Sequence, residues 1–318
     1  MNICYVCSHY FDLIDTQLTL NGQIFERVGM NLILALVSAA AYGVSDFVGG
    51  IASRKHPALQ VVLWAFPVSA LVLLLLSWLI GGEWDTRAMA FGAASGLTSA
   101  LAGWWFFTAL AEGTMSVVSP ITSVLAALIP VFFGLMTGEQ LSVGVLAGIA
   151  FAVVAIVLIS QEGKHSAPHL LASEQPKRLN RRVLLFTVGT GVAFALSFIL
   201  IHQIGETRAG LWPMFAGKTT ASVVTLLIAL RFGHVRISHD ASVLRFAAMV
   251  GVLDVVANVA MYYAFRGAFV SIISVLVSLY PLFTIALAIG LLKERTNALQ
   301  KIGIALALGA IGLIAYGG

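Results

Sequence analysis

Three ionisable residues lie inside apolar runs of this sequence, where a charge is most suited to carry chemistry. Asp46, Lys218 and Asp254 each fall in a mostly apolar stretch. A charge at the middle of a membrane helix costs about 2.5–3.5 kcal/mol, so it needs a partner or a water-filled cavity. Lys218 and Asp254 lie in the same half of the chain and either neutralise each other or serve ligand binding or proton coupling. Asp46 has no evident partner in its half and is either functional or a shallow residue that reaches the membrane surface.

A polar stripe accompanies Asp254. Asp254, Asn258 and Tyr262 recur at i, i+4 and i+8 and therefore share one helix face, and Tyr263 and Arg266 continue it toward the helix end. A membrane helix directs such a stripe toward water or protein and away from lipid.

The first half of the chain supplies the other side of this predicted site. In a register shifted by 155 positions Ser99 aligns with Asp254, so we expect the two helices to line opposite sides of one central space. Trp104 and Trp105 follow Ser99 and could stack on a planar or apolar ligand, although tryptophans also pack or anchor helices at membrane interfaces. The predicted substrate-binding residues are therefore Asp46, Ser99, Trp104, Trp105, Lys218, Asp254, Asn258, Tyr262 and Tyr263.

The composition places these residues in a membrane protein. Of 318 residues, 59% are hydrophobic and 10% charged, whereas soluble domains carry about 25% charged residues. Segments of about 20 apolar residues span a bilayer as helices. The sequence predicts an all-α membrane protein with ten transmembrane helices, near 32–52, 58–80, 88–110, 114–137, 141–160, 183–204, 209–230, 241–265, 268–292 and 297–316.

The ten segments form two related groups of five. The stretch 276–303 aligns with one 155 positions earlier, so that Glu294 falls on Glu139 and Gly303 on Gly148. An odd number of helices per unit inverts the second unit in the membrane. The expected organisation is a polar, disordered N-terminal tail at 1–29, a first five-helix repeat at 30–160, a cytoplasmic linker at 161–182, and a second repeat at 183–318.

The loop charges orient the chain. The side that holds the linker carries most of the Lys and Arg, whereas the opposite side has only Arg27, Arg87, Arg208 and Arg266. The positive-inside rule then places the linker in the cytoplasm and both termini outside, in the cell (inner or plasma) membrane. This distribution also accounts for the basic charge balance without a nucleic-acid partner.

Serines and prolines recur in both halves. Ser116, Ser119 and Ser123 align with Ser271, Ser274 and Ser278, and such small hydroxyl residues either allow close helix packing or offer hydrogen bonds to a polar ligand. Prolines free backbone carbonyls within membrane helices, where transporters contact substrate or bend. The prolines concerned are Pro120, Pro130 and Pro281.

Two acidic residues and four glycines have structural interpretations. Glu139 and Glu294 each end an apolar segment, and we expect each carboxylate to cap the helix that follows it. Glycines in the last segment of each half are expected to be close-packing positions, namely Gly144, Gly148, Gly303 and Gly309.

These motifs resemble the EamA-type branch of the drug/metabolite transporter superfamily. The second half carries the resemblance, in Pro281-Leu-Phe-Thr, Lys293-Glu294-Arg295 and Gln300-Lys-Ile-Gly303. The first half departs from it, with Ala126 at the position that pairs with Pro281 and Tyr42-Gly43 where many members carry Trp-Gly. The resemblance implies a ten-helix secondary transporter, usually an exporter of small metabolites, and names no cargo.

The predicted function is therefore transport of a small metabolite, an amino acid or similar, by alternating access, with export as the direction and protons as a candidate coupling ion. The protein would work in the lipid bilayer as a monomer or homodimer, without a cofactor. A sugar-phosphate-type exchanger, which would need several Lys or Arg in the cavity, and a multidrug efflux pump are the alternatives within transport.

Two further classes are less favoured. A membrane-embedded enzyme would need clustered metal-binding or catalytic residues, but the histidines lie mostly in the tail and loops, no HExxH-type spacing occurs, and the lone Cys4–Cys7 pair is weak evidence for a metal. A channel would differ from a carrier in passing a non-saturating leak.

Overall fold

The computed structural model describes residues 29–49, 51–52, 58–112, 115–160, 181–231, 241–292 and 297–317. The expected tail before Gly29 and nearly all of the expected linker lie outside these residues. Over the described ranges every regular element is a helix. The helices are Gly29–Gly49, α2 (Ala58–Ile80), α3 (Thr86–Glu112), α4 (Met115–Met136), α5 (Val143–Ile159), α6 (Arg181–Ile204), α7 (Trp212–Arg231), α8 (Ala241–Ala264), α9 (Val270–Val277), α10 (Tyr280–Leu292) and α11 (Ala298–Gly317).

Seven segments in the described part of the chain are long and apolar enough to cross a membrane. They are Gly29–Gly49, Gln60–Ile80, Arg181–Ile204, Trp212–Arg231, Ala241–Ala264, Val270–Leu291 and Ala298–Gly317. Two shorter apolar helices, Pro120–Met136 and Val143–Ile159, accompany them. The prediction of an all-α, multi-pass membrane protein is thus confirmed.

The segment expected as one helix at 268–292 is instead divided into α9 and α10. Pro281 has no N–H and cannot donate to the carbonyl of Val277. The chain therefore tightens before it, and the N–H of Leu279 bonds to the carbonyl of Leu276 at 3.2 Å. Near this break the side-chain hydroxyls of Ser274 and Ser278 are fully buried and have no hydrogen-bond partner among the described residues. By contrast, Pro120 and Pro130 lie inside the continuous helix α4.

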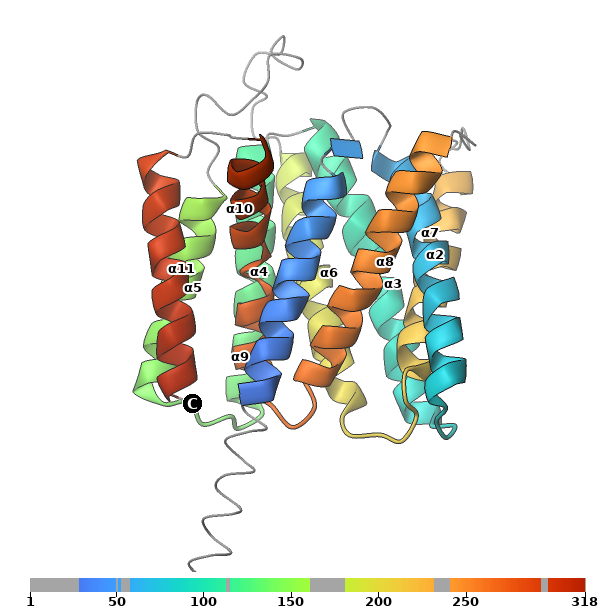
Figure 1. Ribbon diagram of the computed structural model, residues 1–318, viewed down its shortest axis with the longest axis horizontal. Helices are drawn as coiled ribbons and strands as arrows, with labels where there is room; N and C mark the ends of the chain where they lie inside the picture. The colour runs from blue at the N-terminus through green and yellow to red at the C-terminus, as the bar shows by residue number, and fades with distance from the viewer. Residues whose placement is uncertain are drawn as a thin grey trace, which may run out of the picture.

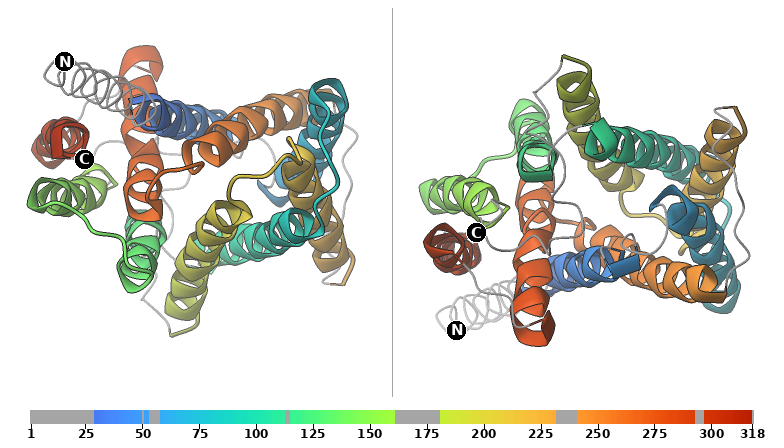
Figure 2. Two further views of the ribbon diagram at one scale, coloured as in Figure 1. Left: turned by 90° about the horizontal axis from the view of Figure 1, so that it is seen from below. Right: turned by 90° about the horizontal axis from the view of Figure 1, so that it is seen from above.

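The helices lie side by side and roughly parallel (Figure 1). α3 packs against α6 and α7, α2 against α7 and α8, and α4 against α6 and α9. α5 and α11 pair with each other at one edge of the bundle, whereas α3 and α8 run along opposite sides of its interior (Figure 2). The expectation that α3 and α8 face each other across the bundle agrees with this arrangement.

The pairing of α5 with α11 depends on two of the four glycines expected to pack closely. A Cβ added at Gly148 would lie 2.8 Å from Cγ1 of Ile314, and one at Gly303 would lie 2.8 Å from Cγ1 of Ile159. Gly144 has only an ordinary contact of 3.4 Å, and a Cβ at Gly309 would meet nothing within 4 Å. The expectation was therefore wrong for Gly309, because that glycine faces outward from the pair.

One end of the bundle, here called the C-terminal face, carries Gly317 and the loops 81–85, 137–142, 205–211 and 265–269 (bottom of Figure 1). The opposite end, called the linker face, carries the end of α5 and the start of α6. At the C-terminal face the Thr207 hydroxyl donates to Oδ2 of Asp85 at 2.7 Å. Nη2 of Arg266 donates to the Thr207 carbonyl at 3.1 Å, and Nδ2 of Asn31 to the Arg266 carbonyl at 3.2 Å. These bonds tie loops of both halves together.

Glu139 strengthens this closure in a way that the sequence did not predict. The helix that follows it, α5, is capped by Ser142, whose hydroxyl accepts from the N–H of Val145 at 3.2 Å. Glu139 instead accepts from the backbone N–H groups of Val270 at 2.6 Å and Ser271 at 3.3 Å, and from the Ser271 hydroxyl. The carboxylate therefore caps α9 in the other half, and the prediction that it caps the next helix was wrong. Glu294 lies outside the described residues.

Candidate functional site

Lys218 is placed by a close crossing of α3 and α7. A Cβ added at Gly96 would lie 1.9 Å from the carbonyl oxygen of Gly217, and one at Gly92 would lie 2.1 Å from that of Pro213. Only glycine permits such backbone contact. The crossing brings Lys218, the residue after Gly217, beside the serines of α3.

Asp254 is placed by a similar crossing of α2 and α8. A Cβ added at Gly251 would lie 2.7 Å from the carbonyl oxygen of Ala65. One turn further along α2, the hydroxyl oxygen of Ser69 lies 2.9 Å from the Gly251 carbonyl and 2.9 Å from Oδ2 of Asp254. This buried serine thus fixes the orientation of the carboxylate.

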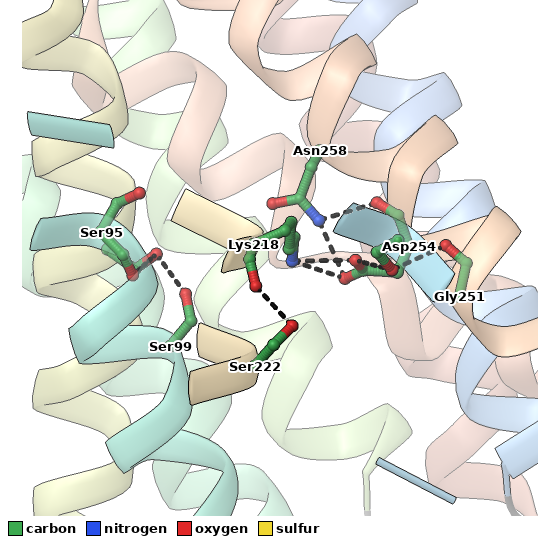
Figure 3. Close-up of polar contacts among 9 residues, drawn as sticks. Ser95, Ser99, Lys218, Ser222, Gly251, Asp254 and Asn258 are labelled. Carbon is green, nitrogen blue, oxygen red and sulfur yellow. Dashed lines mark hydrogen bonds and ion pairs between the residues drawn. The ribbon is translucent and has the colours of Figure 1, made fainter. Parts of the chain in front are cut away.

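Lys218 and Asp254 form a direct ion pair. Nζ of Lys218 lies 2.9 Å from Oδ1 and 2.8 Å from Oδ2 of Asp254, and the two side chains are only 9% and 15% exposed. Asn258 donates from Nδ2 to Oδ1 at 2.9 Å, and the Phe66 ring centre lies 5.3 Å from Nζ. The pair is therefore charge-neutral, supported by hydrogen bonds and by a cation–π contact. Figure 3 shows Lys218 between Asp254 and Asn258 on one side and Ser95 and Ser99 on the other.

A small pocket lies beside this pair, with a cavity volume of about 10 Å³, roughly the space of one water molecule. It is lined by residues of four helices, α3, α6, α7 and α8, namely Ser95, Gly96, Ser99, Ile201, Met214, Gly217, Lys218 and Asn258. Ser99 is held there by a hydrogen bond of 2.8 Å to the hydroxyl of Ser197. The structure thus brings Ser99, Lys218 and Asn258 together, with Asp254 behind Lys218.

The sequence interpretation missed Ser69, Ser95 and Met214. Ser95 could have been found, because it precedes Ser99 by one helical turn and the two hydroxyls share a face of an otherwise apolar helix. Ser69 gives no such signal, since a single serine in an apolar helix is more often a packing residue.

The aromatic residues of the prediction lie away from this pocket. Trp105 packs on α6, where a Cβ added at Gly189 would lie 2.9 Å from its ring atom Cε3. Trp104 is half-buried on α3 and does not line the pocket. Tyr262 is 1% exposed, and its hydroxyl has no hydrogen-bond partner in the described part of the chain. Its ring stacks at an angle on that of Tyr263, with centres 5.3 Å apart, nearer the C-terminal face.

Asp46 lies on the Gly29–Gly49 helix and is exposed. Its carboxylate acts electrostatically on the hydroxyls of Tyr42 and Tyr280, and Asp254 also acts on Tyr42. Asp46 does not line the pocket, but it belongs to the same central group of polar side chains.

These features define a multi-pass helical membrane protein with an ion pair buried at its centre. The chain belongs to the EamA-like transporter family, whose family model matches it twice, over residues 29–161 and 181–316. This confirms the resemblance seen in the sequence and places the chain among membrane transporters.

Individual proteins are also similar to this chain. An uncharacterized protein of Methanocaldococcus jannaschii is 36% identical over 92 residues, which cover 29% of this chain and 65% of that protein. The chain thus spans slightly less than two thirds of that relative's length. A protein of known crystal structure superposes with a TM-score of 0.69 over 90% of this chain and 95% of its own, at 13% identity. That likeness establishes a shared fold.

Proposed function

We propose that this chain is a secondary transporter that moves a small metabolite, an amino acid or similar, by alternating access. In this proposal ten membrane spans form two inverted five-helix repeats, at 30–160 and 183–318, joined by the linker at 161–182. The cargo binds between the repeats, and export from the cytoplasm is the working direction. Asp254, Lys218 and Asp46 carry ionic recognition or proton coupling.

The repeat organisation is supported by the double match to the family model, which leaves the linker between its two parts. Counting α9 and α10 as one interrupted span gives five helices on each side of the linker. The first helix begins at Gly29 on the C-terminal face, and α6 begins at Arg181 on the linker face, as inversion of the second repeat requires.

One observation carries the proposal: the ion pair of Lys218 and Asp254 lies beside a pocket between helices of both halves. A carboxylate of the cargo can replace Asp254 at Lys218 while an amino group of the cargo binds Asp254. The net charge of the site plus a zwitterion then stays at zero, which limits the electrostatic cost of a charged ligand inside the membrane. Asn258 and Ser99 offer neutral hydrogen bonds to the rest of such a ligand.

The alternatives have weaker support. A sugar-phosphate exchanger needs several cations at its site, whereas Lys218 is the one Lys or Arg among the described residues that line the pocket, and Asp254 balances its charge. A channel needs a continuous path, whereas hydrogen bonds join the loops of the C-terminal face. The basic residues Arg181, Arg182, Arg231, Arg245 and Lys301 at the linker face favour a cytoplasmic location for that face.

Flux into proteoliposomes tests the proposal. A panel of radiolabelled amino acids is offered to vesicles containing the wild-type protein, Asp254→Asn, or the control Glu206→Gln, which makes the same kind of change in an exposed loop residue. We expect saturable uptake of at least one amino acid by wild type and the control, and its loss in Asp254→Asn. Non-saturating leak, or equal saturable uptake by Asp254→Asn, would contradict the proposed site and mechanism.

A further inference from the structure

Asp46 is exposed on the side of its helix opposite the exposed apolar residues. The exposed apolar residues of this helix are Met30, Ile33 and Val37, at 56%, 57% and 42%. At 3.6 residues per turn, Asp46 points about 180° away from their mean direction. In the upper part of the helix Ala41 and Val48, which share that mean direction, are only 7% and 8% exposed, so the exposure of Asp46 does not continue the exposed apolar stripe.

The residues that share the face of Asp46 are packed inside the protein. Ala35 and Ala39, at i−11 and i−7, are both 0% exposed, and Tyr42 at i−4 is partly buried. The nearby Tyr280 hydroxyl, on which Asp46 acts electrostatically, is bonded to the hydroxyl of Ser123 on α4 at 2.9 Å. Protein atoms thus close this face below Asp46, whereas Asp46 itself is exposed.

The height of Asp46 places this exposed residue on the linker side. At 1.5 Å per residue, Asp46 lies about 25 Å above the start of its helix at the C-terminal face, and Asp254 lies about 15 Å above the end of α8 at the same face. Asp46 is therefore between the ion pair and the linker face. The C-terminal face is held closed by the bonds of Asp85, Arg266 and Glu139.

The charge of Asp46 differs from that of the ion pair. The Lys218 ammonium and the Asp254 carboxylate neutralise each other. With the residues that the structure describes, Asp46 forms neither a hydrogen bond nor an ion pair. A carboxylate partly surrounded by low dielectric attracts a cation more strongly than one in bulk water.

We infer that Asp46 is a docking carboxylate for a positively charged amino group of the cargo, in a vestibule that opens toward the linker face. The cargo meets Asp46 first and then the ion pair, so Asp46 selects amines over anions. This inference rests on the proposed transport function and adds to it the charge that the cargo must present on entry.

Charge-selective thiol labelling tests the vestibule without knowledge of the cargo. The reporter is Gly49→Cys in a background with Cys4→Ser and Cys7→Ser, because a Cβ at Gly49 meets nothing within 4 Å and lies one turn from Asp46. The probes are two methanethiosulfonates of similar size, the trimethylammonium-ethyl cation and the sulfonatoethyl anion, each normalised to its rate with a free thiol. Asp46→Asn, Asp46→Glu and the distant control Glu206→Gln are compared in this background.

We expect the ratio of cation to anion labelling rates to fall about fivefold in Asp46→Asn. The reason is that this change removes one negative charge about 6–7 Å from the reporter thiol. The ratio should persist in Asp46→Glu and in the control. An unchanged ratio in Asp46→Asn, or no labelling from the linker side, would overturn the inference.

A transport measurement separates this inference from the proposed function. Proteoliposomes are offered tyramine, tyrosine and 4-hydroxyphenylacetate, which share a ring and differ in charge. Saturable flux of the amines that falls at least tenfold in Asp46→Asn supports the inference, and saturable flux of the anion alone overturns it while leaving a carrier in place. Charge-selective labelling without saturable flux of these three compounds or of any amino acid in the panel above supports the docking site and contradicts the carrier.

Discussion

Removing one member of the Lys218–Asp254 pair should destabilise the protein more than removing both. The side chains are 9% and 15% exposed, so a single neutralisation leaves a buried charge without its partner, at a cost of about 3–5 kcal/mol. Asp254→Asn should be the more harmful change, because the Lys218 ammonium then keeps the Phe66 ring and the neutral amide oxygen of the new asparagine but loses its counter-charge. In Lys218→Met, Asp254 still has Asn258 and Ser69.

The double variant Lys218→Met/Asp254→Asn should recover most of the loss, since no charge remains buried. Apparent melting temperatures of purified protein, followed by size-exclusion fluorescence, provide the measurement. At about 2 °C per kcal/mol for a chain of this size, each single variant should melt roughly 6–10 °C lower, and the double variant within about 2–3 °C of wild type. Transport should be absent in all three. If the decrease in melting temperature of the double variant equalled the sum of the two single decreases, Lys218 and Asp254 would be energetically independent. They would then not stabilise each other as an ion pair.

Three further predictions concern packing and the closed face. Gly96→Ala places a Cβ 1.9 Å from a facing carbonyl oxygen of α7. This change should lower the free energy of unfolding by at least about 1–3 kcal/mol and abolish flux. The control Gly103→Ala on the same helix, whose Cβ meets nothing within 4 Å, should melt like wild type. Glu139→Gln removes a charge-assisted cap worth about 1.5–3 kcal/mol and should speed hydrogen–deuterium exchange in the first turn of α9, whereas unchanged exchange would argue against a closing role. Hydrogen bonds from the first turn of α3 and from Thr207 lower the pKa of Asp85 below its ordinary value of 3.8, so this contact is present above that pH and is lost as the pH falls through the lowered pKa. Exchange in the 205–211 loop should therefore rise only below about pH 4, and Asp85→Asn should abolish that rise.

The class and much of the helical layout followed from the sequence because they depend on local properties. Apolar length sets the spans, and the cost of a buried charge singled out Lys218 and Asp254, for which pairing was one of two interpretations. The spacing of Asp254 and Asn258 by one turn likewise placed them on one face, and both contribute to the site.

What the sequence did not predict depends on partners distant in the chain. Glu139 precedes α5 and was assigned to it, but the turn at Gly138, with φ of 96°, carries the carboxylate to α9, 131 residues away. Ser69 lies 185 residues from the carboxylate that it orients. Pro281 was recognised as a helix breaker, yet the two-helix outcome needed the shorter-range hydrogen bonds from Leu279 to Leu276 and from Leu282 to Leu279. Each of these contacts is selected by packing between helices, which periodicity does not encode.

The contacts that close the C-terminal face share one property that bears on the mechanism. The bonds from Asn31 to Arg266, from Thr207 to Asp85 and from α9 to Glu139 each join residue ranges that match separate copies of the family model. A rotation of one half against the other would break all of them together while leaving the helices of each half intact. Reversing a 99:1 ratio of the closed to the open form of this face requires a free-energy change of about 5.5 kcal/mol. A few such hydrogen bonds contribute free energy of the same order. In the proposed function, a cargo in the pocket lies between Ser99 of the first half and Lys218 of the second. Its binding would add interaction energy at the interface that has to move and so shift the equilibrium of this face.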